Sequence, residues 1–290
     1  MKRLTLSAPA KINLTLDVVG KREDDDYHLI RTVMQTVTLS DTVTVTRVEE
    51  PGIFLRLSDK TLPTDRRNTA YAAAKAFWNA LPEAERVGGI DIYIDKKIPQ
   101  QAGLAGGSAD AAAVLRGCNR LWADPFSTDA LCAFAVSIGA DVPFCVRGGA
   151  ALATGIGEVL EPVKSLPEEL FVVICKPAVS VSTAEAYKAV DTFAGERRLS
   201  DEAGMIAALE AGDAAAVGER LYNVFEDVLP LPEVAAIRGE MAKFSPLGSQ
   251  MSGSGSAVFA LFASEADAKA CREALQEFGT VTLCRPLSNE

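Results

Sequence analysis

The stretch Pro99-Gln-Gln-Ala-Gly-Leu-Ala-Gly-Gly-Ser-Ala109 lies between a predicted strand and a predicted helix. Before it, isoleucines alternate with polar residues over 90–95, which is the period of a half-buried strand. After it, apolar residues recur at helical spacing over 114–121, and Ser108 stands where an N-cap is expected. Glycines at a helix entrance expose backbone N–H groups beside the positive end of the helix dipole, and together these can hold an anion. The stretch therefore predicts a phosphate-binding loop, although not the P-loop of common nucleotide triphosphatases because no Gly-Lys-Ser/Thr follows; the alternative is a tight connection without a ligand.

A second glycine cluster, Met251-Ser-Gly-Ser-Gly-Ser256, directly precedes the apolar run 257–262. Such small residues indicate that something approaches the backbone closely or that the chain turns sharply; the alternative is a β-bulge at the entry of a strand. Two glycine-rich loops in one chain, each attached to a regular element, favour nucleotide or phosphate chemistry more than a single loop would.

The N-terminal segment from Ala8 to Val19 alternates cleanly between apolar and polar residues. Lys11 and Asn13 fall on the same face of the strand that this pattern predicts. They could meet a ligand there, or they could belong to a solvated strand face.

Asp141 stands among apolar residues in the segment Ile138-Gly-Ala-Asp-Val-Pro-Phe144. An acid in such surroundings must cap a helix, pair with a cation or take part in chemistry. Helix capping is the commoner role of a lone Asp in a loop of this kind.

Four segments taken in their order along the chain resemble one enzyme family. They are Pro9-Ala-Lys-Ile-Asn-Leu14, Gly103-Leu-Ala-Gly-Gly-Ser-Ala-Asp-Ala-Ala112, Gly139-Ala-Asp-Val-Pro-Phe144 and Met251-Ser-Gly-Ser-Gly255. The chain resembles the GHMP small-molecule kinases from about Leu6 to Phe262. The first and third segments, together with Lys21-Arg22 and Tyr27-His28, are most similar to members whose acceptor is a cytidine diphosphate sugar alcohol.

The resemblance implies a catalytic pair, Lys11 and Asp141. Asp141 would accept or orient the proton of the acceptor hydroxyl, and Lys11 would stabilise charge on the transferred phosphoryl group. The resemblance also implies that the first glycine-rich stretch wraps the phosphates of ATP, with the Ser108 hydroxyl near Mg²⁺. That loop consists of Pro99, Gln100, Gln101, Ala102, Gly103, Leu104, Ala105, Gly106, Gly107, Ser108 and Ala109.

An acceptor site is implied by the same resemblance. Its residues are Asn13, Tyr27, His28, Tyr187, Gly253 and Gly255. Tyr27 and His28 would contact the cytosine, and Tyr187 would sandwich the same base. Asn13 and the second glycine-rich loop would lie near the sugar-alcohol end.

One loop departs from the family pattern Lys-Arg-x-Asp-Gly-Tyr-His, because this chain reads Lys21-Arg-Glu-Asp-Asp-Asp-Tyr-His28. The glycine is lost and a residue is added, so a turn that needs a positive φ must use Asp, which tolerates that region better than most side chains. We expect the change to displace the loop that presents Tyr27 and His28. Ala105, where many relatives have Gly, is a milder departure.

The composition is that of an ordinary soluble protein of 290 residues, 48% apolar and 23% charged. No apolar run approaches the roughly 20 residues of a membrane-crossing helix, and no signal peptide precedes the first strand, so we expect a cytoplasmic protein without a membrane partner. The net charge of −10 argues against nucleic acid as a partner. Six cysteines without C-x-x-C spacing predict buried free thiols, and the single histidine, His28, excludes a Ser-His-Asp triad elsewhere.

The predicted elements form an α+β fold in two layers. Strands are expected at about 4–19, 36–48, 53–57, 90–97, 148–154, 170–175, 257–262 and 280–286, and helices at about 67–80, 108–121, 127–138, within 183–243 and at 264–278. The Pro-containing stretch 161–167 suits a boundary, which gives domains 1–162 and 163–290. The family resemblance implies an N-terminal domain like ribosomal protein S5 domain 2, a ferredoxin-like C-terminal domain, and an active site in the cleft between them.

We therefore expect an ATP- and Mg²⁺-dependent phosphotransferase that acts on an alcohol group of a cytidine diphosphate sugar alcohol, as a monomer or homodimer. Two alternatives are another GHMP kinase, of the homoserine or mevalonate type, and a non-catalytic protein of this fold that senses a nucleotide or sugar. Tyr27, His28 and Tyr187 favour the first reading, because an aromatic clamp suits a nucleobase. The presence of both Lys11 and Asp141 argues against a sensor.

Overall fold

The computed structural model describes residues 2–289, and its packing divides the chain into two compact units. The first unit comprises the chain up to Ala10, together with Ser40–Ile98 and Ala105–Arg147. The second comprises Lys11–Leu39, Pro99–Leu104 and the chain from Gly148 onward. Each unit joins segments that are far apart in sequence. The domains 1–162 and 163–290, which follow sequence order, stay a prediction.

Two long strands contribute residues to both units. β1 spans Arg3–Lys21 and β2 spans His28–Val48, and the two are neighbours in a seven-stranded sheet. Ile12 and Leu14 of β1 are fully buried, as the alternation of the N-terminal segment predicts. The order of the sheet is β3-β4-β2-β1-β8, with β5 paired to β2 and β6 paired to β5.

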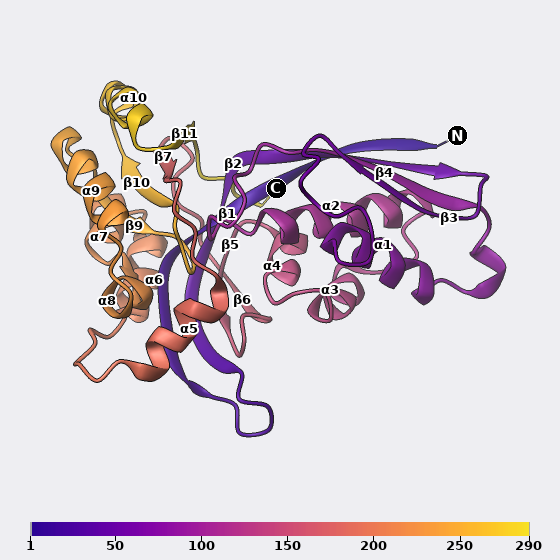
Figure 1. The fold of residues 1–290 in the computed structure, drawn as a ribbon, viewed down its shortest axis with the longest axis horizontal. Coiled ribbons are helices and arrows are strands. Elements are labelled where there is room, and N and C mark those ends of the chain that lie inside the picture. Colours follow the sequence, from indigo (N-terminus) through magenta and orange to yellow (C-terminus); the bar gives the residue numbers. More distant parts are fainter. Residues whose placement is uncertain (1, 290) are drawn as a thin grey trace. The chain divides into compact units, whose positions relative to one another are not determined.

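In the first unit, strands β3 (Gly52–Leu57) and β4 (Gly89–Asp95) pair in parallel, and β4 pairs antiparallel with β2. Figure 1 shows helices gathered on one face of these strands. They are α1 (Thr69–Ala80), α2 (Gly106–Leu121), α3 (Thr128–Val136) and α4 (Val142–Arg147), with a short 3-10 turn η1 (Glu83–Glu85). Helix α2 packs against both α1 and α4 and buries most of its length. Its Ala- and Gly-rich sequence allows this, because small side chains let neighbouring helix axes approach.

The second unit contains a four-stranded antiparallel sheet of order β11-β7-β10-β9. Its strands are β7 (Phe171–Lys176), β9 (Gly248–Met251), β10 (Val258–Phe262) and β11 (Thr280–Cys284). Numbered in chain order these strands read 4-1-3-2, the ferredoxin-like arrangement that the sequence analysis expected. Helices α9 (Pro232–Met241) and α10 (Glu265–Ala274), with the turns η2 (Ala242–Phe244) and η3 (Leu275–Glu277), pack against the sheet (Figure 1).

Shorter elements complete the second unit. They are the hairpin strands β5 (Ala150–Thr154) and β6 (Val159–Val163), the helices α5 (Thr183–Thr192), α6 (Glu202–Ala211), α7 (Ala214–Glu219) and α8 (Val224–Val228), and the two-residue strand β8 (Tyr222–Asn223). A capping box at Ser182 and Glu185 starts α5, because the Ser side chain accepts from the Glu N–H while the Glu carboxylate accepts from the Ser N–H. Val224 and Phe225 are buried in the core.

The structure corrects several predicted elements. Strand β2 begins at His28 rather than at 36, because residues 32–37 are buried on both faces and so lack the alternation that marks a half-buried strand. The sequence analysis missed β6, β8, β9 and α4. Strand β9 reads Gly-Ser-Gln-Met, residues of low strand preference, and it exists through its pairing with β10.

Two predictions from composition can be compared with the structure. All six cysteines are free thiols, and all but the half-buried Cys132 are buried. Burial raises the pKa of Cys271 and Cys284 to about 12, so these thiols are unreactive at neutral pH. Within residues 2–289, none of the helices has the length and apolar character needed to cross a membrane.

Candidate active site

Helix α2 begins at the end of the first glycine-rich stretch. Ala105, at the N-cap, adopts a left-handed conformation with φ of 58° and makes no side-chain cap, and the helix starts at Gly106. The prediction of Ser108 as the N-cap is therefore wrong: the left-handed residue turns the chain directly into the helix, and Ser108 lies in its first turn. The first helical hydrogen bond runs from the N–H of Ala109 to the carbonyl of Ala105 at 2.8 Å. The N–H groups of Gly106 to Ser108 thus precede the helical ladder, as an anion site requires.

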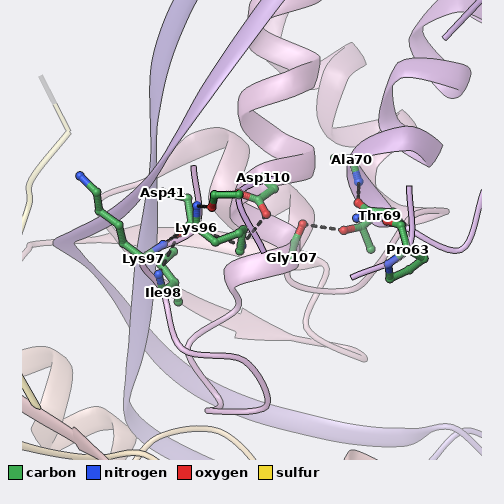
Figure 2. Close-up of polar contacts among 11 residues, drawn as sticks. Asp41, Pro63, Thr69, Ala70, Lys96, Lys97, Ile98, Gly107 and Asp110 are labelled. Carbon is green, nitrogen blue, oxygen red and sulfur yellow. Dashed lines mark hydrogen bonds and ion pairs between the residues drawn. The ribbon is translucent and has the colours of Figure 1, made fainter. Parts of the chain in front are cut away.

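Two other segments of the first unit lie against this helix start. The Thr69 hydroxyl donates to the carbonyl of Gly107 at 2.7 Å, which ties α1 to α2 (Figure 2). A Cβ at Gly139 would lie 4.0 Å from the Ser108 hydroxyl oxygen, so the turn before Asp141 is next to that hydroxyl. Asp141 itself is partly buried, and its carbonyl accepts from the Cys145 N–H at the start of α4. The first unit thus brings together Ser108 and the segment that carries Asp141.

A buried ion cluster, which the sequence analysis missed, supports the same region. The Lys96 ammonium donates to Asp41 and, at 2.6 Å, to Asp110 of α2 (Figure 2). The other Asp41 oxygen accepts from the N–H groups of Lys97 and Ile98 at 2.5 and 2.8 Å, which fixes the chain just before the loop. A Cβ at Gly106 would lie 3.7 Å from the Lys96 nitrogen, so this cation lies beside the first turn of α2.

Burial and the neighbouring charges both shift the pKa values of this cluster. Burial lowers the pKa of Lys96, but the adjacent carboxylates of Asp110 and Asp41 outweigh it and raise the pKa above its ordinary value. Burial and the neighbouring Asp41 charge raise the pKa of Asp110 to about 7, although Lys96 counteracts them. One oxygen of Asp110 is buried without a hydrogen-bond partner.

In the second unit, the two glycine-rich segments contact each other through their backbones. A Cβ at Gly103 would collide with the carbonyl oxygen of Ser252, and a Cβ at Gly253 would lie 2.9 Å from the Cα of Gly103. The Ala257 N–H donates to the carbonyl of Ala102 at 3.3 Å. The close backbone approach predicted for the second cluster is confirmed, and its partner is the first half of the other loop. Glycine is needed because no side chain fits between them.

Lys11 and Asn13 lie beside this contact and are buried, with 4% and 2% of their surface exposed. The reading of their strand face as solvated is therefore wrong. The Lys11 N–H donates to the carbonyl of Leu104 at 3.1 Å, and its ammonium donates to the Asn13 side-chain oxygen at 2.6 Å. Lys11 belongs to the second unit and Asp141 to the first, and their catalytic pairing stays a prediction.

His28 and Tyr187 form a stacked aromatic pair in the second unit. Their ring centroids lie 4.5 Å apart at an interplanar angle of 27°. Asp191, one turn after Tyr187 on α5, bonds the His28 ring at 2.8 Å and the Lys21 ammonium at 2.9 Å, and these hydrogen bonds lower the pKa of its carboxyl. Tyr27 is 57% exposed and does not join the stack. The structure thus brings together two of the three predicted aromatic residues.

The altered loop 21–28 turns as the sequence analysis expected. Asp26 adopts a positive φ of 59°, in place of the glycine of the family pattern. Asp25 pairs with Arg22 at the surface, and the Arg22 guanidinium lies 5.5 Å from the centre of the Tyr27 ring. One of the added carboxylates is therefore neutralised within the loop.

Family descriptions match both parts of the chain. The GHMP kinases N terminal domain matches residues 68–149, and the GHMP kinases C terminal domain matches residues 205–281. The chain belongs to the GHMP kinase family. In this GHMP kinase, the N-terminal match includes the whole first glycine-rich stretch, Pro99–Ala109, and Asp141, and the C-terminal match includes the Gly253–Gly255 loop.

Curated relatives of this GHMP kinase carry a more specific name. The chain is similar to the 4-diphosphocytidyl-2-C-methyl-D-erythritol kinase of Caldicellulosiruptor saccharolyticus, with 44% identity over 95% of this chain and 93% of the relative. It is also similar to the enzyme of the same name from Shouchella clausii, with 46% identity over 91% of this chain and 87% of the relative.

Solved structures agree with this grouping. A crystal structure of a 4-(cytidine 5'-diphospho)-2C-methyl-D-erythritol kinase matches 99% of this chain and 100% of its own, with 34% identity and a TM-score of 0.81. A homoserine kinase from Cytophaga hutchinsonii matches 99% of this chain and 96% of its own at a TM-score of 0.78, but at 20% identity it shows the shared fold alone.

Proposed function

We propose that this GHMP kinase transfers the γ-phosphoryl group of ATP to the 2-hydroxyl of 4-diphosphocytidyl-2-C-methyl-D-erythritol, giving the 2-phosphate and ADP. The reaction belongs to the non-mevalonate route to isoprenoid precursors. The observation that favours this acceptor over others of the family is the stacked pair of His28 and Tyr187, held by Asp191. An aromatic surface of this kind suits a cytosine ring, and homoserine or mevalonate has no ring to use it.

The start of α2 is our proposed site for the ATP phosphates. The loop Pro99–Ala109 supplies backbone N–H groups, and its glycines allow phosphate oxygens to approach the chain. The protein carries a net charge of −10, so attraction of the anionic nucleotide depends on local groups such as these.

Two side chains would act on the transferred group. The acceptor oxygen forms a bond to the γ-phosphorus while the bond from that phosphorus to the bridging oxygen of ADP breaks. Asp141 would receive the proton of the acceptor hydroxyl, and Lys11 would stabilise the negative charge on the moving phosphoryl group.

Mg²⁺ fits the oxygen donors near α2. Among residues 2–289 no group of three His, Cys, Asp or Glu side chains could hold a metal by itself. Such a chain suits an ion that arrives with ATP and takes one or two ligands from the protein. The Ser108 hydroxyl is the oxygen donor we assign to it, and the ion would neutralise charge on the phosphates.

For the acceptor, we propose that His28 and Tyr187 hold the cytosine and that Tyr27 contacts it from the loop tip. Gly253 and Gly255 would border the sugar-alcohol end through their backbone. The predicted contact of Asn13 with that end stays a prediction, since its amide already bonds Lys11.

The test is ADP release with ATP, Mg²⁺ and each of four acceptor conditions: the cytidyl substrate, homoserine, mevalonate and none. We expect turnover with the cytidyl substrate alone, and a loss of about 100-fold or more in Asp141→Ala. Tyr187→Ala should raise KM for the acceptor and leave KM for ATP unchanged. The matched control is Asp129→Ala, which removes an exposed acid of the same unit and should behave as wild type. Turnover with another acceptor would discard the cytidyl assignment, and nucleotide binding without any turnover would support a sensor.

A further inference from the structure

A buried hydrogen-bond network in the second unit holds the side chain to which the Lys11 ammonium donates. Lys11 donates to the side-chain oxygen of Asn13 at 2.6 Å. The amide nitrogen of Asn13 donates to the Thr32 hydroxyl at 2.8 Å, and the Asn13 N–H donates to the Ser252 hydroxyl at 3.3 Å. Asn13, Thr32 and Ser252 are 2%, 1% and 0% exposed, so bulk water does not replace any of these partners.

The direction of each bond follows from counting protons. The Thr32 hydroxyl has one proton, and at 2.5 Å it donates that proton to the carbonyl of Thr15, which can only accept. Toward Asn13 the hydroxyl can therefore only accept, so the NH₂ end of the amide must face Thr32. The oxygen end must then face Lys11. Were the amide turned over, its NH₂ group would face an ammonium, and two donors would meet in a buried site.

The Ser252 hydroxyl connects Asn13 to the phosphate loop. It accepts from the Asn13 N–H and has a single proton for two acceptors, the carbonyl of Gly103 at 3.0 Å and the Asn13 oxygen at 3.4 Å. The shorter contact favours Gly103. The position of the glycine-rich loop and the anchor of Lys11 are thus linked through one side chain.

We propose that Thr32 and Ser252 are positioning residues for phosphoryl transfer: Thr32 orients the side-chain amide of Asn13 and Ser252 fixes the Asn13 backbone, so that the amide oxygen holds the Lys11 ammonium beside the phosphate loop. Neither residue touches the substrates in this role. The inference rests on the proposed catalytic role of Lys11. A displacement of a reacting group by about 1 Å can cost about 100-fold in rate, so a misplaced lysine should be seen in kcat.

Thr32→Val tests the proposal, because it keeps the shape of the side chain and removes the hydroxyl. We expect kcat to fall by about 10- to 100-fold while KM for ATP and for the acceptor changes by less than about threefold. Thr32→Ser restores the hydroxyl and should recover most of kcat. Ser252→Ala removes the acceptor of the Asn13 backbone N–H and the donor to the Gly103 carbonyl, and should lower kcat and also raise KM for ATP, since it releases Gly103.

The matched control is Thr44→Val. Thr44 lies on the same strand as Thr32, is 7% exposed, and bonds a hydroxyl of β1, that of Thr5, at 3.1 Å. Thr5 precedes Lys11 on that strand by six residues, which is about 20 Å of extended chain. Thr44→Val should lose stability like Thr32→Val and keep the wild-type kcat. If Thr32→Val fails to fold, the kcat values of Thr32→Ser and Ser252→Ala still test the positioning role: it predicts a kcat near that of the wild type for the first and a lowered kcat for the second.

The outcomes separate the two proposals. A wild-type protein without turnover on the cytidyl substrate refutes the proposed function. A fully active wild type whose Thr32→Val variant matches Thr44→Val in kcat refutes the positioning role alone. If the wild type turns over a different acceptor, the same variants are compared on that acceptor, and the expected ratio of kcat values is unchanged.

Discussion

Two buried lysines, one in each unit, show how differently the protein handles a cation removed from water. The side chain of Lys96 is 8% exposed, and its partners are the carboxylates of Asp41 and Asp110. Lys176 is also 8% exposed, but it donates to the carbonyls of Pro177 and Val179, both at 2.8 Å, and to the Ser180 hydroxyl at 3.2 Å. Burial lowers the pKa of Lys176, whereas the carboxylates raise the pKa of Lys96 despite burial. The charge of the partners therefore decides the state of a buried lysine.

The two arrangements also support different segments. Lys96 joins the end of β4 to the start of α2, and so lies under the proposed phosphate site. Lys176 ends β7 and holds the segment that leads to α5, the helix that carries Tyr187. The Ser256 hydroxyl of the second glycine-rich loop donates to the same Val179 carbonyl. One lysine thus fixes a charged junction and the other a neutral one.

The largest effect should come from Lys96→Met. This change leaves two carboxylates together in a buried site, and breaking a buried pair costs about 3–5 kcal/mol. Urea unfolding at pH 7 measures the free energy of unfolding. Lys97→Met, at the exposed neighbouring position, should change it by less than about 0.5 kcal/mol. Addition of Asp110→Asn to Lys96→Met should recover part of the loss, and no recovery would contradict the assignment of the strain to the two carboxylates.

The next effect concerns pH. The pKa of Asp110 is raised to about 7, whereas an unfolded Asp titrates near 4. The folded state therefore binds the proton more tightly, and through this group the free energy of unfolding decreases as the pH rises from about 4 to about 7. Asp110→Asn cannot titrate, so its stability should decrease less over that range. Urea unfolding at intervals between pH 5 and 8 checks this, and equal slopes for the two proteins would show that Asp110 is ionised throughout.

A smaller loss is expected for Lys176→Met. The substitution removes the donor to the Pro177 carbonyl and to the Ser180 hydroxyl, and one of the two donors to the Val179 carbonyl, but it creates no unpaired charge, so we expect a cost of about 1–3 kcal/mol. The same unfolding measurement applies. A loss as large as that of Lys96→Met would mean that the number of hydrogen bonds, rather than the charge of the partners, determines the cost.

The smallest effect is expected at the surface. Arg56 and Asp91 form an ion pair at 2.8 Å between β3 and β4, with 65% of the arginine side chain exposed. Arg56→Met should cost about 0–1 kcal/mol, and added salt should abolish the difference. A cost near that of Lys96→Met would mean that burial does not determine how much an ion pair contributes to stability.

Local patterns in the sequence predicted much of this fold. The alternation in β1 and β4 marked both strands, although β1 is buried on both faces over residues 11–18, and the glycine clusters marked places where backbones approach closely. The need for a positive φ in the altered loop was also visible, and Asp26 supplies it. Strand β2 was predicted short and β9 was missed, because a strand buried on both faces has no alternation and a weak strand former pairs only when its neighbour is in place.

For the candidate site too, some features could be predicted from the sequence and others could not. The sequence by itself determined which residue types stand at the loops, the family to which the chain belongs, and the residues Lys11 and Asp141 as candidates for catalysis. Only the tertiary structure placed Asp41 and Asp110 on Lys96, stacked His28 on Tyr187, and joined Asn13 to Thr32 and Ser252. The physical reason is that a hydrogen bond or ion pair between distant segments depends on how the chain folds back on itself, and it leaves no periodic signal in either segment.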